Sequence, residues 1–129
     1  MTAYTDPAMF NAGLTAMSTN ANKVFIDTSQ PTTYTAASST YLCGTATPGG
    51  AGATVGAPGN DAGTGQEVTV AAISSGGAIS ATATAAFWGV AYSTGSILYA
   101  GNSLSSSQSV TNGNAFTLAS FTIDLRGAT

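Results

Sequence analysis

The side chains that could take part in catalysis are few in this sequence. A hydroxyl nucleophile needs a neighbouring base, and a chain with no histidine leaves only carboxylates or Lys23 for that role. The spacing of the carboxylates indicates no pair for general acid–base catalysis, although two of them could still meet in space. We therefore expect no catalytic site and no enzyme activity. The acidic residues are Asp6, Asp27, Asp61, Glu67 and Asp124.

Metal and cofactor sites are not predicted either. Zinc needs several nitrogen or sulfur ligands, and Cys43 is the only cysteine. A calcium loop could be imagined through Asn60, Asp61 and Glu67, but the pattern has too few acidic ligands. The glycines between residues 45 and 66 precede no lysine and no helix, so they do not form a phosphate-binding loop. We interpret Cys43 as a small, apolar packing residue.

The composition favours a protein that acts by contact within an assembly. The 129 residues suffice for a single domain, 1–129, and are 43% hydrophobic but only 5% charged, where about a quarter is usual. A net charge of −3 gives little self-repulsion. Lys23 and Arg126 are the only basic residues, which is too few to form the basic patch that binds nucleic-acid phosphates. No apolar run reaches the roughly 20 residues of a membrane span, and the first residues do not resemble a signal peptide.

The N-terminal arm and helix, residues 1–22, begin with a helix-start signal. Asp6 can cap a helix whose first residue is Pro7. Apolar residues then recur at spacings of three and four, which predicts a helix over residues 7–19. We expect its single apolar stripe to pack against another part of the structure. Residues 23–29 alternate in the manner of a strand. The stripe consists of Met9, Phe10, Leu14 and Met17.

A long Gly-rich loop, residues 45–66, separates this part from the main strand region, residues 67–126. The loop has one branched aliphatic residue, Val55, so we expect it to be ordered only where it lies on a neighbour. Residues 74–77 and 111–114 carry turn signals.

The strands of residues 67–126 alternate in a way that indicates which faces are covered. Residues 81–92 read as a strand that becomes apolar on both faces from Phe87 onward, and residues 93–95 turn the chain into a hairpin. A break in alternation predicts a bend at Ala119 and Ser120. Together these patterns predict a mainly β fold, an antiparallel, jelly-roll-like β-sandwich with one N-terminal α-helix.

The aromatic residues allow two interpretations. They could form the core and subunit contacts, or they could form platforms that bind sugars. The strongest cluster, Phe87, Trp88 and Tyr92, lies in mid-strand and not at loop tips, which favours core or contact. Trp88 is also a candidate interface anchor.

Several segments resemble a family of short structural proteins encoded among the head genes of tailed bacteriophages and prophages. They are an N-terminal helix, "QPTTYTAASSTYLCG", "GAPGNDAGTGQEVTVAA", "SATATAAFWGVAYS" with "ILYAG", and "LSSSQSVTNGNAFTLASFTIDL". The resemblance covers most of the chain in the same order. It implies a virion component, a decoration or cement protein on the outer surface of the capsid.

We therefore expect a homotrimer that binds between subunits of the phage major capsid protein. Residues 1–19 and the 45–66 loop are expected to reach the neighbours, and deletion of residues 1–19 is expected to abolish attachment while the sheet stays folded. The alternative is a receptor- or carbohydrate-binding module of a tail fibre or spike. The interface candidates are Tyr4, Phe10, Leu14, Val55, Pro58 and Trp88.

Overall fold

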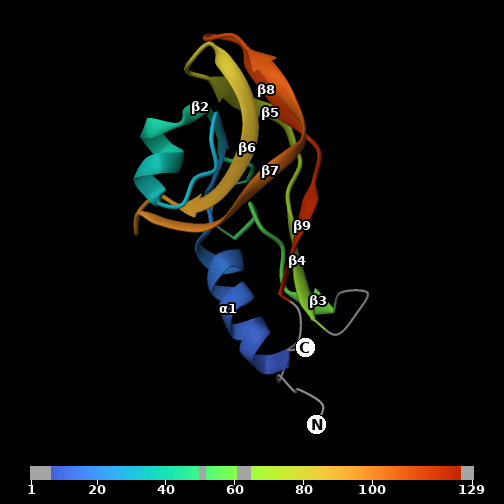
Figure 1. Ribbon diagram of the computed structural model, residues 1–129. Helices are drawn as coiled ribbons and strands as arrows, with labels where there is room; N and C mark the ends of the chain where they lie inside the picture. The colour runs from blue at the N-terminus through green and yellow to red at the C-terminus, as the bar shows by residue number, and fades with distance from the viewer. Residues whose placement is uncertain (1–6, 50–51, 61–64, 126–129) are drawn as a thin grey trace.

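A computed structural model describes residues 7–49, 52–60 and 65–125 of the chain (Figure 1). The fold is mainly β, antiparallel and sandwich-like, with an α-helix at its N-terminal end, as predicted. The elements are α1 (Pro7–Asn20), β1 (Lys23–Asp27), the π-helix η1 (Ala36–Thr40), β2 (Leu42–Ala46), β3 (Gly59–Asn60), β4 (Gln66–Val70), β5 (Ile73–Ile79), β6 (Ala83–Tyr92), β7 (Ile97–Val110), β8 (Ala115–Leu118) and β9 (Phe121–Leu125).

The strands form two antiparallel sheets, and the chain crosses from one sheet to the other more than once. The larger sheet has the order β7-β6-β1-β2-β5-β8, and the smaller has the order β3-β4-β9. The chain leaves β4 for β5 at residues 71–72, and it leaves β8 for β9 at residues 119–120. The bend predicted at Ala119 and Ser120 is thus confirmed, and it is the point at which the last strand moves from one sheet to the other.

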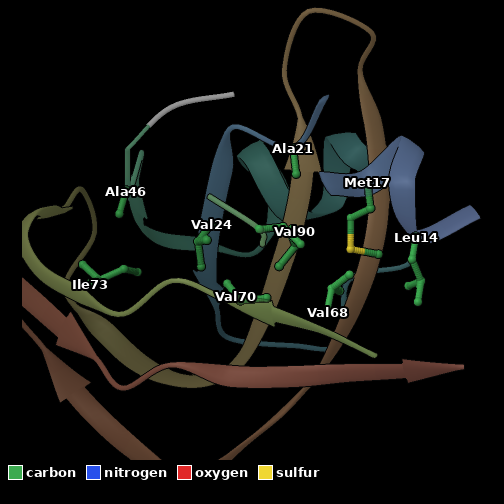
Figure 2. Packing of buried hydrophobic residues seen from close by; sticks show 10 residues of the cluster. Leu14, Met17, Ala21, Val24, Ala46, Val68, Val70, Ile73 and Val90 are labelled. Atoms are coloured by element: carbon green, nitrogen blue, oxygen red, sulfur yellow. The ribbon is translucent and has the colours of Figure 1, made fainter. Parts of the chain in front are cut away.

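The helix α1 and both sheets share one hydrophobic core (Figure 2). The helix is present over the predicted residues, and its stripe brings Leu14 and Met17 inward, where they are 1% and 6% exposed. They pack in one cluster with Val68 of β4 and Val90 of β6. A helix with a narrow apolar stripe is stabilised mainly by such packing and not by its intrinsic propensity.

The strand β6 is covered on both faces over its second half, as its sequence predicted. Val90 and Ala91 are both fully buried although they point to opposite faces. Val90 belongs to the cluster under α1, whereas Ala91 packs with Phe25 and Ala37 beside η1. The β6–β7 hairpin forms around the turn at residues 93–96, which contains the predicted turn.

The prediction of a turn at residues 74–77 is wrong. These residues lie within β5, where the register against β8 shifts between Ile73 and Gly77 and Gly76 adopts a φ of +82°. Glycine accommodates this bulge because it has no Cβ to strain a positive φ. The strand therefore continues through a segment whose composition is typical of a turn.

We predict opposite effects for alanine at two glycines of this fold. A Cβ on Gly77 would lie 2.6 Å from the carbonyl oxygen of Phe116 in the paired strand, so Gly77→Ala is expected to lower the free energy of unfolding by about 1–3 kcal/mol. A Cβ on Gly13 of α1 meets nothing within 4 Å, so Gly13→Ala is expected to raise the free energy of unfolding by about 1 kcal/mol. Urea denaturation of both variants checks this, and a neutral Gly77→Ala would contradict the pairing of β5 with β8.

Candidate interaction surfaces

Two of the six interface candidates are core residues of this chain. Leu14 and Val55 are 1% and 0% exposed, and they belong to the same cluster under α1. Val55 is buried because its loop segment lies along β4: Gly56 donates to the Thr69 carbonyl at 2.9 Å, and Ala71 donates to the Thr54 carbonyl at 2.8 Å. We therefore reassign both side chains from an intermolecular contact to the core.

The remaining candidates differ in what the structure says of them. Tyr4 lies outside the described residues, and the side chain of Phe10 is likewise outside the description. Pro58 is half-buried next to β3, and Trp88 is half-buried in β6, with its ring centroid 4.4 Å from that of Phe121. Trp88 thus links the larger sheet to β9, and it remains partly exposed.

Large apolar side chains stay exposed at one end of the molecule. Met9, in the first turns of α1, is 62% exposed, and Leu125, the last residue of β9, is 39% exposed. The beginning of α1, the end of β9 and the short strand β3 all lie at the lower end of the view in Figure 1. We call Met9, Leu125 and β3 the end surface. The described parts of both segments predicted to reach neighbours, residues 1–19 and the 45–66 loop, extend to it.

The strand register places two carboxylates close together, although their spacing in the sequence did not indicate a pair. Glu67 of β4 stands directly opposite Asp124 of β9, so both side chains lie on the same face of the smaller sheet. Neither residue lines the hollows beside Trp88 and Leu104. Within residues 7–49, 52–60 and 65–125, no group of three or more His, Cys, Asp and Glu could hold a metal ion.

Asp27 is fully buried, which the sequence patterns did not predict. Asp27 ends β1 with 0% exposure, and neither of its carboxylate oxygens has a hydrogen-bond partner among the described residues. Burial raises the pKa of Asp27 to about 7, because the charged form loses its hydration. Cys43 is also fully buried, and burial together with the nearby Asp27 raises the pKa of its thiol. The sequence predicted a small packing residue at this position, and Cys43 is one, although it is fully and not half buried.

The aromatic side chains do not form exposed platforms in the described part of the chain. Each aromatic residue whose burial the structure gives is buried or half-buried. Phe25 and Tyr34 pack edge to face with centroids 6.1 Å apart, and Trp88 packs on Phe121. These contacts favour the interpretation of the aromatics as core and contact residues.

Comparison of the chain with protein-family models, curated proteins and solved structures finds no match. Among the described residues, no helix is both long and apolar enough to span a membrane.

Proposed function

We propose that this protein is a virion structural protein that decorates the outer surface of a phage head. It binds between subunits of the major capsid protein, as a homotrimer, and it stabilises the shell by contact without a cofactor. The observation that carries the proposal is the end surface, where large apolar side chains are exposed on a chain with only two basic and five acidic residues. The sequence resemblance to head-gene structural proteins supports the same role.

The composition explains why contact is a fitting mode of action. Burial of apolar surface supplies association energy without any charged group, at roughly 25 cal/mol per Å². Exposed side chains such as Met9 and Leu125 add to that energy when a partner covers them. Among the described residues, the cluster that joins α1 to both sheets does not include Met9 or Leu125.

Charge placed on the end surface tests this proposal. The double variant Met9→Asp/Leu125→Asp is expected to bind heads that lack the native protein with at least tenfold lower affinity, which corresponds to about 1.4 kcal/mol. Ile97→Asp is the matched control, because Ile97 is also large, apolar and 44% exposed but begins β7. Binding to purified heads is measured by co-sedimentation. Full occupancy by the double variant would contradict attachment through the end surface.

The alternative role, receptor or carbohydrate binding at the tail, predicts a different location. A tail module would be present in few copies at the tail tip and would bind glycans as a purified protein. A decoration protein would repeat over the head lattice and would show no glycan preference.

A further inference from the structure

The two ends of the larger sheet face one another. In the described part of the chain, β7 pairs only with β6 and β8 pairs only with β5, so each strand has one edge without a ladder partner. Residues 111–114 nevertheless join β7 directly to β8, and side chains of both strands line the same hollow. The sheet therefore curls until its two free edges border a common gap, and the two strands joined by residues 111–114 do not pair with each other.

This gap is a continuous groove, which we call the β7–β8 groove. One hollow of about 480 Å³ and another of about 370 Å³ share Leu104, Ser105, Leu118 and Ala119 in their linings. On one side the groove is lined by residues 102–106 and 108–111, and on the other side by residues 114–122. It thus follows β8 and the beginning of β9 along their unpaired edge.

A break in the β6–β7 ladder shapes one wall of the groove. Ala85 pairs with Gln108 and Phe87 pairs with Ser103, so a two-residue step on β6 faces a five-residue step on β7. The extra residues bulge out of the ladder. Leu104, at the beginning of this bulge, packs on the buried cluster that contains Ala85.

The lining of the groove selects an uncharged occupant. Asp, Glu, Lys, Arg and His are all absent from the residues that line it. Its floor is aliphatic at one end, where Ile26, Ile79 and Ala85 are buried, and aromatic at the other, where Trp88 meets Phe121. A charge placed there would lose hydration without gaining a partner. The walls carry Ser, Thr, Asn and Gln side chains together with the free strand edges.

We propose that the β7–β8 groove accepts an extended, uncharged segment of another protein chain as an added β-strand. Free strand edges recognise a polypeptide through main-chain hydrogen bonds, and alternate side chains of that strand would face the floor. The walls run along residues 114–122, so a strand of about six to eight residues fits at roughly 3.3 Å per residue. The inference is independent of attachment to a capsid, because it rests on the unpaired strand edges and the uncharged lining of the groove and not on the end surface.

A designed peptide tests the proposal with Trp88 as the reporter. The probe is a blocked eight-residue peptide of alternating Thr and Val, and its matched control carries Pro at alternate positions, which removes main-chain donors. Trp88 is the only tryptophan and lines the groove. The Thr/Val probe is expected to change its fluorescence saturably and to protect amides of residues 104–110 and 115–118 from hydrogen exchange. The proline probe is expected to bind at least tenfold more weakly.

Variants locate the binding to the groove. Ser106→Lys and Thr117→Lys, both at exposed lining positions, are each expected to weaken the Thr/Val probe at least tenfold, whereas Thr94→Lys in the turn at residues 93–96 is expected to leave it unchanged. The proposal would be overturned if the fluorescence of Trp88 showed no saturable response, or if the proline probe bound as tightly as the Thr/Val probe. It would also be overturned if neither Ser106→Lys nor Thr117→Lys weakened binding of the Thr/Val probe. An oligomer that forms without peptide and dissociates in Ser106→Lys would also overturn it, because the occupant would then be a second copy.

Discussion

Replacing Asp27 with Asn is expected to remove most of the pH dependence of the protein's stability between about pH 4 and pH 7. Burial raises the pKa of Asp27 from 3.8 to about 7, so the folded chain holds a proton that the unfolded chain releases. The stability contributed by this group is therefore fully present below about pH 3.8 and is lost as the pH rises toward 7. At about 1.4 kcal/mol per pH unit, the loss is on the order of 4 kcal/mol at most.

Urea denaturation across this pH range checks the expectation. The native chain should become steadily less stable as the pH rises, while Asp27→Asn should give a nearly level curve, because the amide does not titrate. A native curve that varies by less than about 1 kcal/mol, or a variant that keeps the native slope, would show that Asp27 is solvated or paired in solution.

Leu14→Ala is expected to lower the free energy of unfolding by about 3 kcal/mol, since it leaves a cavity in the core. The Leu14 side chain is 1% exposed and lies in the cluster that joins α1 to both sheets. Removal of residues 1–19 would delete Met17 as well, and would uncover Val55 and Val68. That truncation is therefore expected to destabilise the sheets, and not to leave them folded as the sequence suggested.

Thr15→Ala is the control for this prediction, because Thr15 is exposed on the same helix. Its effect should stay within about 0.5 kcal/mol. If Leu14→Ala were equally mild in urea denaturation, α1 would not be docked on the sheets in solution. In that case the N-terminal helix would be available to reach a neighbour, as the sequence alone suggested.

The parts of the fold that could be predicted are those set by local patterns. Pro7 and the spacing of Leu14 and Met17 predicted the helix, and the alternation of residues 81–92 predicted a strand covered on both faces. The interrupted alternation at residues 119–120 predicted a bend. Each of these features depends on neighbours in the sequence, so the sequence pattern carries the information.

The parts that could not be predicted depend on which strands pair. Residues 111–114 form a turn, but the strands on either side pair with β6 and β5 and not with each other. Gly76 and Gly77 are a bulge only because β8 lies beside them. Val55 is buried because its loop lies along β4.

The candidate site shows the same division. Trp88 was identified from its place in an apolar strand, and it does line the β7–β8 groove. Met9 was assigned to the helix stripe but is 62% exposed, whereas Leu14 and Met17 of the same stripe are buried. Leu125 alternates with Phe121 and Ile123, a pattern that places the three on one apolar face, yet it is 39% exposed as the last residue of β9. Burial of Asp27 could have been suspected from its position after Val24, Phe25 and Ile26 in one strand.

An electron cryomicroscopy map of the virion tests most directly whether this protein acts by contact on the head. Trimers are expected at every equivalent position on the outer surface of the capsid, with the beginning of α1 and β3 directed toward the major capsid protein. Heads that carry no such density, or density for this chain only at the tip of the tail, would contradict it.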